Sequence, residues 1–208
     1  MNSNPCEVKI SAIVLAAGGS LRLGIPKQLL MWRGKPIISY ILDQINKVNF
    51  YSTIVVLGND SKKIEEIIGK QEILIITNPL WQSGIGTSIR AGVRSLPRNI
   101  DAVIIFVVDQ PFLPPILINN LINTYIKEKS KIIAPCVNGI QTNPVLFDQS
   151  MFKVLKGLKD DEGAKKYINS YRTSLINWED DRLLLDIDTI EDYHKLISKS
   201  YTSKSPLL

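Results

Sequence analysis

The amino-acid sequence predicts an α/β protein, a three-layer sandwich in which helices cover both faces of a mixed, mostly parallel β-sheet. In the first half of the 208 residues, short apolar segments alternate with longer segments whose apolar residues recur every three or four positions. That alternation is typical of parallel strands buried on both faces by helices. In the second half, a tight turn at 137–140 precedes another strand-like segment. Such a turn cannot join parallel neighbours, so we expect an antiparallel addition.

The strands are expected where apolar runs are short and rich in β-branched residues. In chain order they cover residues 10–15, 53–57, 73–77, 102–108, 131–135, 143–147, 173–178 and 183–187. Asp186 and Asp188 alternate with apolar residues around the last of these segments. On a strand, both carboxylates would therefore point to one face.

The helices are expected where apolar residues follow helical spacing. In chain order they cover residues 36–45, 61–68, 87–96, 114–125 and 152–158, then one that starts at 160–164 and ends before 172, and a last one from 189. Several boundaries have local reasons. Pro36 suits a first helical turn, Gly69 suits a helix end, and Thr189 with Asp192 resembles a capping box.

Size and composition are those of one globular domain spanning residues 1–208, with its core at about 10–196 and a flexible tail after 198. Hydrophobic residues make up 45% of the chain and charged residues 22%, as in ordinary globular proteins. No apolar run approaches the roughly 18 residues that a membrane span needs. The first nine residues lack a signal-peptide core, and two cysteines form no metal or disulfide pattern. We therefore expect a cytoplasmic protein without a membrane partner.

The formal net charge of +5 raises the possibility of nucleic-acid binding. The lysines are scattered, however, and no aromatic residues alternate with them along a basic stripe, as they do in many single-strand binders. A small ligand rich in phosphate explains a modest positive charge equally well. We expect no nucleic-acid partner.

The chain is organised around a glycine-rich loop at residues 16–27, directly after the first strand. Small residues at a strand end let a ligand approach the backbone, and successive N–H groups in such a turn form an anion site. Two cations, Arg22 and Lys27, follow within reach. Backbone donors with two cations suit a polyphosphate. The nucleotide-binding candidates here are Leu15, Ala16, Ala17, Gly18, Gly19, Ser20, Arg22 and Lys27.

This loop is not one of the common phosphate motifs. Gly19 and Gly24 have the P-loop spacing, but Ile25 follows where that motif needs lysine. A dinucleotide fingerprint starts at Gly84 and Gly86 and fails at Ile89, where the last glycine would stand. An ordinary strand-to-helix turn with two surface cations is the alternative interpretation.

A second loop, residues 78–92, leads into a helix with hydroxyl side chains at its start. The N-terminus of such a helix suits an anionic ligand, which makes Gly84, Thr87 and Ser88 further nucleotide-binding candidates. Ordinary helix capping by serine and threonine explains the same residues equally well.

Asp109 ends the most apolar strand of the chain. In open α/β sheets, ligands bind beyond the carboxyl ends of the strands. A carboxylate placed there loses hydration unless a cation meets it. Capping of the next helix is the other interpretation, but Pro114 lies five residues on. We therefore favour metal ligation by Asp109.

Together these segments resemble the molybdenum cofactor cytidylyltransferase (MocA-like) family of nucleotidyltransferases, over residues 10–196. That family has a Rossmann-like nucleotide-diphospho-sugar transferase fold. The first motif is shared by many transferases, whereas five motifs in this order are specific to this branch. They are Leu15 to Lys27, Asn78 to Gly92, Asp109-Gln110-Pro111, Asn143 to Phe147 and Asp186-Ile187-Asp188-Thr189.

The resemblance implies Mg²⁺-dependent transfer of CMP from CTP to the terminal phosphate of molybdopterin, with release of pyrophosphate. It implies that Arg22, Lys27 and Asp109 are catalytic, the two cations holding the phosphates, and that Asp109 and Asp188 hold Mg²⁺. Asn143 and Pro144 would face the acceptor. An apo-molybdoenzyme client is a further implied partner. A catalytic protein nucleophile is not required, because the incoming phosphate attacks.

Two departures from the family pattern affect the choice of substrates. Guanylyl-transferring relatives usually carry glycine where Ala17 stands, so Ala17 favours cytosine over guanine as the base. The difference is a single methyl group, which gives only modest discrimination. Lys165 stands where the family has arginine, and lysine lacks bidentate phosphate recognition. The alternatives are a non-catalytic molybdopterin carrier on the same fold, or a cytidylyl- or guanylyltransferase acting on another phosphorylated acceptor.

Overall fold

The computed structural model describes residues 8–20, 22–69, 71–168 and 170–201. The tail expected after residue 198 falls partly on residues 202–208, which lie outside the described residues; the last helix continues to Tyr201. No helix in the described part of the chain is long and apolar enough to cross a membrane.

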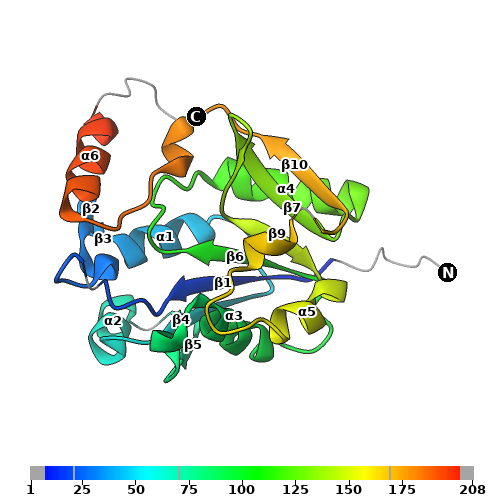
Figure 1. Ribbon diagram of the computed structural model, residues 1–208, viewed down its shortest axis with the longest axis horizontal. Coiled ribbons are helices and arrows are strands. Elements are labelled where there is room, and N and C mark those ends of the chain that lie inside the picture. The colour runs from blue at the N-terminus through cyan, green and yellow to red at the C-terminus, as the bar shows by residue number, and fades with distance from the viewer. Residues whose placement is uncertain (1–7, 21, 70, 169, 202–208) are drawn as a thin grey trace.

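A mixed eight-stranded sheet forms the middle layer (Figure 1). Its strands run in the order β10-β7-β9-β6-β1-β4-β5, and β8 pairs with β7 beside this path. Their bounds are β1 Ile10–Ala16, β4 Ser52–Leu57, β5 Leu74–Thr77, β6 Ala102–Val107, β7 Ile132–Val137, β8 Ile140–Gln141, β9 Val145–Asp148 and β10 Thr173–Asn177. A separate hairpin pairs β2 (Met31–Trp32) with β3 (Lys35–Pro36).

The strand directions confirm the predicted mixture. β1 pairs in parallel with β4 and β6, and β5 extends the parallel part beyond β4. β9 is antiparallel to both β6 and β7, because only a short turn and β8 separate it from β7 along the chain. Within the sheet, β4 lies on one side of β1 and β6 lies on the other, so the strand order reverses at β1. Such a switch point is where α/β sheets bind ligands.

Helices cover both faces because consecutive strand residues point to opposite sides. From β1, Ala12, Val14 and Ala16 enter a core with α1, α2, α4 and α6, while Ile13 and Leu15 enter one with α3 and α5. In Figure 1, α3 and α5 lie along one side of the sheet and α1 and α4 along the other. The helix bounds are α1 Ile37–Ile45, α2 Ser61–Ile68, α3 Ile85–Arg94, α4 Pro115–Glu128, α5 Phe152–Lys156 and α6 Ile190–Tyr201.

The strand predicted at 183–187 is wrong. Residues Asp181–Leu184 form a one-turn 3-10 helix instead, because the Asp180 side chain accepts a hydrogen bond from the Arg182 backbone N–H and starts a turn. Leu183 buries itself against Leu117 and Val137. The alternation of Asp186 and Asp188 therefore does not come from a strand.

The helix predicted from 160–164 to before 172 is also shorter than expected. It is a 3-10 helix at Ala164–Tyr167. Three further 3-10 turns are Lys27–Leu29, Trp81–Ser83 and Gln149–Met151. The capping box at the start of α6 is confirmed: the Asp192 carboxylate accepts from the Thr189 N–H, and the Asp192 N–H donates to the Thr189 hydroxyl.

Candidate active site

The glycine-rich loop is closed by Ser20. The Lys27 backbone N–H donates to the Ser20 Oγ atom over 2.9 Å, and the Leu23 N–H donates to the Ser20 carbonyl oxygen over 2.9 Å. Ser20 has a φ of 49°, in the left-handed region that turns the chain sharply. The loop therefore returns to the end of β1 and places Lys27 beside it.

The buried side chain of Gln28 holds the start of the same loop by hydrogen bonds. Its side chain is 1% exposed, and its Nε2 amide donates to the carbonyl oxygens of Ala16 and Gly18 over 2.7 and 3.0 Å. Sequence reasoning missed this residue as part of the site. A glutamine directly after a loop lysine is an ambiguous signal, since most glutamines lie on the surface.

Lys27 joins two carboxylates from distant parts of the chain. Its Nζ atom lies 3.2 Å from Asp109 Oδ2 and 3.0 Å from Asp188 Oδ1. Asp109 follows β6, and Asp188 lies in the segment before α6. The backbone N–H of Ile187 donates to the Asp109 carbonyl oxygen over 3.1 Å, which docks the late segment at this point. The two predicted metal ligands are thus brought together, with a lysine between them.

Asp186 is a third carboxylate at this centre, which the sequence reasoning did not place among the site residues. The residue is exposed overall, but its side chain lines a cavity and bonds the Gln110 amide. Lost hydration raises the pKa of the Asp186 carboxyl group above its usual value. The charges of Asp109 and Asp188 act in the same direction, whereas the Gln110 hydrogen bond and the Lys165 charge oppose them.

The first of two adjoining cavities lies at the ends of β1 and β6. It has a volume of about 190 Å³. The predicted site residues that line it are Leu15, Ala17, Gly18, Lys27, Ser88 and Asp109. They are accompanied by Gln28, Trp81, Ile85, Val107 and Val108. The structure thus gathers residues of the glycine-rich loop, α3 and Asp109 around one hollow.

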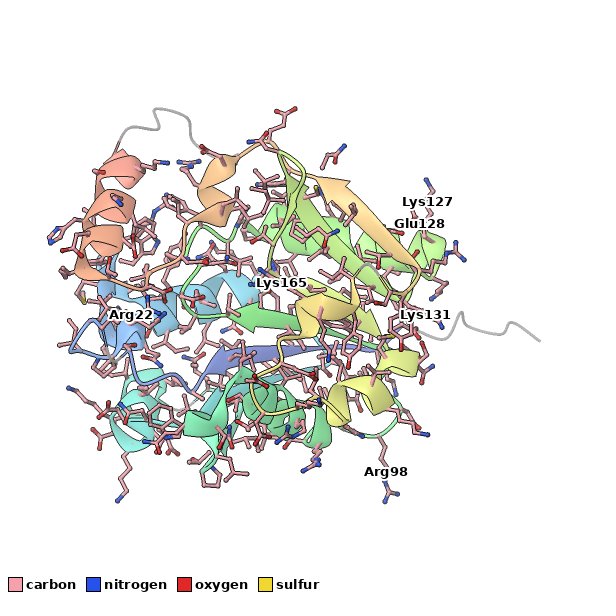
Figure 2. The ribbon with its side chains drawn as sticks, in the orientation of Figure 1. Arg22, Arg98, Lys127, Glu128, Lys131 and Lys165 are labelled. Carbon is pink, nitrogen blue, oxygen red and sulfur yellow. The ribbon has the colours of Figure 1, made fainter. Side chains whose placement is uncertain are left out.

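The second cavity adjoins the first. It has a volume of about 220 Å³, and both cavities share Leu15, Ile85, Val107 and Asp109 in their walls. Its remaining walls include Asn143, Lys165 and Asp186. Lys165 is exposed, and Figure 2 shows it near the middle of this view. Pro144 is buried behind this cavity, in a smaller one with Gln110.

Several predicted residues lie near these cavities without lining them. Ala16 is the buried last residue of β1, Gly19 belongs to the loop, and Arg22 is exposed beyond the end of β1 (Figure 2). Thr87 is 3% exposed. Its hydroxyl donates to the Gly84 carbonyl oxygen and accepts from the Asn78 amide. The Thr87 side chain therefore bonds within the protein, and the residue before α3 that caps it is Gly84, without a side-chain hydrogen bond.

The start of α3 interlocks with residues 158–163. The Arg90 guanidinium donates to the Leu158 carbonyl oxygen and pairs with the Asp160 carboxylate at 2.6 Å. The Gly86 N–H donates to the Asp160 carbonyl oxygen over 2.8 Å. A Cβ atom on Gly86 would lie 1.9 Å from the Lys159 carbonyl oxygen, so only glycine allows this contact. Ile85 and Ser88 of α3 line the first cavity, and residues 163–165, at the end of the interlocked segment, line the second.

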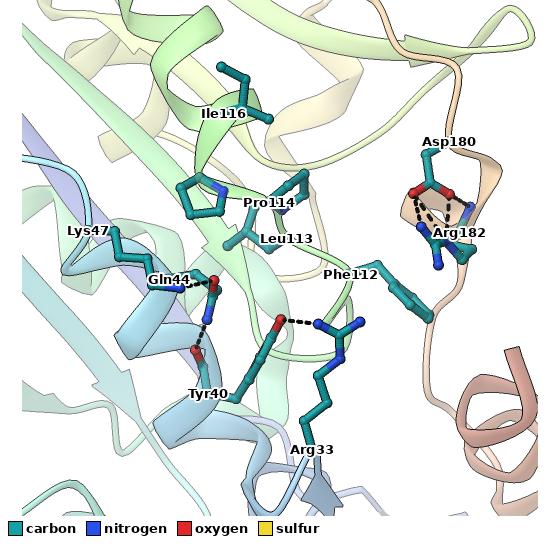
Figure 3. Close-up of a pocket in the computed structure, with 11 residues that line it drawn as sticks. Arg33, Tyr40, Gln44, Lys47, Phe112, Leu113, Pro114, Ile116, Asp180 and Arg182 are labelled. Carbon is teal, nitrogen blue, oxygen red and sulfur yellow. Dashed lines mark hydrogen bonds and ion pairs between the residues drawn. The ribbon is translucent and has the colours of Figure 1, made fainter. Parts of the chain in front are cut away.

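A larger groove of about 440 Å³ lies apart from these two cavities. Figure 3 shows it between α1, the chain before α4 and the turn at 180–182. Its charged side chains already have partners in the protein: Arg33 meets the Tyr40 hydroxyl, Lys47 meets Gln44, and Arg182 pairs with Asp180. It contains none of the predicted site residues.

The donor set at Asp109 and Asp188 fits a metal that also binds a ligand. Among the described residues, no three His, Cys, Asp or Glu side chains gather as a metal site. Mg²⁺ is typically held by one or two carboxylates together with substrate phosphates. Two carboxylates that converge on one lysine ammonium group can hold a cation there, and a phosphate would have to complete its coordination.

Fold and site define a class: an α/β protein whose acidic and cationic groups meet at the switch point beside a glycine-rich loop. Residues 12–175 match the model of the MobA-like NTP transferase domain. The chain belongs to that family.

Two relatives illustrate the range of the family. The chain is 24% identical over 204 residues to nicotine blue oxidoreductase of Paenarthrobacter nicotinovorans, covering 93% of this chain and 97% of that protein. It is 26% identical over 135 residues to a probable molybdenum cofactor guanylyltransferase of Natranaerobius thermophilus, covering 62% of each.

The fold is that of Rv0371c from Mycobacterium tuberculosis H37Rv. Its crystal structure superimposes with a TM-score of 0.85 at 24% identity, covering 92% of this chain and 98% of that one. A manganese complex of Rv0371c gives a TM-score of 0.80 at 22% identity, with coverages of 92% and 99%. This likeness confirms the predicted nucleotide-diphospho-sugar transferase fold.

The interlock between α3 and residues 158–163 predicts the behaviour of Arg90→Met. This variant loses charge-assisted hydrogen bonds, each typically contributing about 1.5–3 kcal/mol, so residues 158–165 should open more often. We expect their amide hydrogen exchange to accelerate by about tenfold or more. Mass spectrometry of the exchanged peptides measures this.

Arg94→Met is the matched control, because Arg94 lies one turn further along α3 and is exposed. Its exchange should equal that of the wild type. Unchanged exchange at 158–165 in Arg90→Met would contradict the interlock.

Proposed function

We propose that this protein transfers CMP from CTP to the terminal phosphate of molybdopterin or the molybdenum cofactor and releases pyrophosphate. An acceptor phosphate oxygen attacks the α-phosphorus of CTP. The bond from that phosphorus to the bridging oxygen breaks, and the electron pair leaves with pyrophosphate. The observation that carries this proposal is the pair of adjoining cavities whose shared wall includes Asp109, with Lys27 beside it.

The first cavity suits the nucleotide. Phosphoryl-type transfer depends on positioning and on neutralised charge more than on a protein nucleophile. In the proposal, the backbone of Gly18, Gly19 and Ser20 holds the β- and γ-phosphates together with Arg22 and Lys27. These groups stabilise the negative charge that develops on the departing pyrophosphate.

Lys27 then has two successive partners. Its ammonium group pairs with both Asp109 and Asp188, so one positive charge serves two negative ones. Arriving phosphates offer Lys27 a more highly charged partner, and the two carboxylates become available to Mg²⁺. When bound, this metal ion supplies Lewis-acid stabilisation of the phosphate oxygens. Asp109 and Asp188 would then hold the metal ion, while Lys27 would hold the phosphates.

The second cavity suits the acceptor. Lys165 brings a positive charge to its wall, opposite the carboxylate of Asp186, and Asn143 adds an amide. A phosphate entering from this side would meet Lys165 and face Asp109. The guanylyltransferase name of the Natranaerobius relative supports a molybdenum cofactor acceptor. An apo-molybdoenzyme would receive the product.

The choice of cytosine rests on the methyl group of Ala17 in the first cavity, where guanylyl-transferring relatives usually have glycine. One methyl group gives limited discrimination. GTP is therefore the competing donor in the test below.

Two other functions have less support. A non-catalytic carrier needs no pair of carboxylates beside the phosphate loop. An oxidoreductase activity, the name of the Paenarthrobacter relative, would favour a dinucleotide fingerprint, but the buried Ile89 takes its last glycine position.

Calorimetric titration with CTP, GTP and ATP, each with and without Mg²⁺, tests the proposal. We expect CTP to bind most tightly, and only with Mg²⁺ present, followed by pyrophosphate release once molybdopterin is added. Tighter GTP binding would keep the chemistry but change the donor. A protein that binds molybdopterin and no nucleotide would be a carrier.

The Asp109→Asn variant should lose about a hundredfold or more in turnover, the scale of removing one charge-stabilising group. Pyrophosphate release with CTP and molybdopterin measures the loss. Asp43→Asn is the control, because Asp43 is an exposed carboxylate on α1 that also pairs with a lysine. Turnover near the wild-type rate in Asp109→Asn would remove Asp109 from the site.

A further inference from the structure

Trp81 stands in the wall of the first cavity, although its sequence position indicates only a loop residue. It begins the 3-10 turn Trp81–Ser83 between β5 and α3. The side chain is half-buried, packs against the core on the α3 side of the sheet, and lines the cavity. Of the other two tryptophans, Trp32 is 1% exposed and Trp178 is half-buried against a separate core cluster.

Two glycines make room for the indole. A Cβ atom on Gly58 would lie 2.6 Å from Trp81 Cγ, and one on Gly19 would lie 2.6 Å from Trp81 Cη2. These atoms are at opposite ends of the ring system. The indole therefore extends from the end of β4 to the glycine-rich loop in close contact with both backbones, which fixes its position at the cavity.

The remainder of the cavity wall near Trp81 is apolar. Leu15, Ala17, Ile85 and Val107 contribute aliphatic side chains, and Ile85 is 44% exposed at the helix start. An aromatic ring and aliphatic side chains with a few polar groups are typical of a site for a flat organic ligand. Base stacking on an aromatic side chain typically contributes binding for any base, because every base has a π-face.

We propose that the indole of Trp81 is the surface on which the nucleoside of the bound nucleotide packs. The inference rests on the proposed function, because it takes the ligand of this cavity to be a nucleoside triphosphate. It adds a binding residue outside the glycine-rich loop. It also links the nucleoside to the phosphate loop, because the same ring supports Gly19.

Tryptophan fluorescence during a titration with CTP and Mg²⁺ tests this directly. A base stacked on Trp81 should quench its emission as the cavity fills. The chain has two other tryptophans, Trp32 and Trp178. The Trp81→Phe variant removes only the signal of Trp81, so the quench should disappear in it while CTP still binds by calorimetry.

Affinity separates stacking from simple space filling. Trp81→Phe keeps a π-face and should bind CTP within about threefold of the wild type. Trp81→Leu keeps apolar bulk and should bind about tenfold more weakly. Trp178→Phe is the control and should change neither the affinity nor most of the quench. Melting temperatures report whether each variant folds.

The outcomes are distinguishable. If CTP binds the wild type without changing the Trp81 signal, and Trp81→Leu binds equally well, the role of Trp81 is overturned and the proposed function stands. If neither CTP nor another nucleotide binds the wild type, the proposed function falls and this inference with it. If Trp81→Leu fails to fold, the quench in the wild type and its loss in Trp81→Phe still decide.

Discussion

The ion pairs of Lys27 with Asp109 and Asp188 are the constraint on which the site depends. They join the glycine-rich loop after β1, the chain after β6 and the segment before α6. The sheet brings the first two together because β1 and β6 are parallel neighbours whose carboxyl ends coincide. The third arrives through the backbone hydrogen bond from Ile187 to Asp109. Separating these groups would leave the half-buried Asp109 carboxylate without its counter-ion.

In the proposed function, Lys27 and a divalent metal ion would bind the same two carboxylates, Asp109 and Asp188. The single positive charge of Lys27 joins two carboxylates, and in the proposed function the same lysine attracts the phosphates. Asp186 adds negative charge close by, and Lys165 opposes it from the second cavity. The three carboxylates of Asp109, Asp186 and Asp188 therefore outnumber the two ammonium groups of Lys27 and Lys165, and each proposed substrate brings a charge that alters this ratio.

Much of the fold follows from the sequence because periodicity is a strong signal. The strands β1, β4 and β6 are short, almost wholly apolar runs, and the turn before β9 excludes a parallel connection. The error at 183–187 has a local cause: Leu183 and Leu185 look like strand residues, but the Asp180 cap turns the chain into a 3-10 helix. A capping aspartate favours a helical turn, whereas a short apolar pattern favours a strand. The sequence alone does not show which of these two structures forms.

The site was predictable in part. Gly18 and Asp109, which follow strand ends, and Lys27, at the end of the glycine-rich loop, were predicted to lie together because the carboxyl ends of strands gather ligands, and they line one cavity. Asp186 and Arg90 were missed because their roles depend on contacts with residues far along the chain. Gln28 was missed because its side chain turns back to the carbonyl oxygens of the preceding loop. Thr87 was proposed from its residue type, whereas its hydroxyl completes the loop between β5 and α3.

The central claim is that Lys27 and a divalent metal ion compete for Asp109 and Asp188. Titration of the nucleotide-free protein with Mn²⁺, followed by electron paramagnetic resonance, measures this competition without any turnover. Lys27→Met should bind Mn²⁺ about tenfold more tightly than the wild type, within the usual range of coupling between sites. Lys35→Met, which removes an exposed lysine paired with Asp43, should not change the affinity. Equal or weaker Mn²⁺ binding by Lys27→Met would contradict the account.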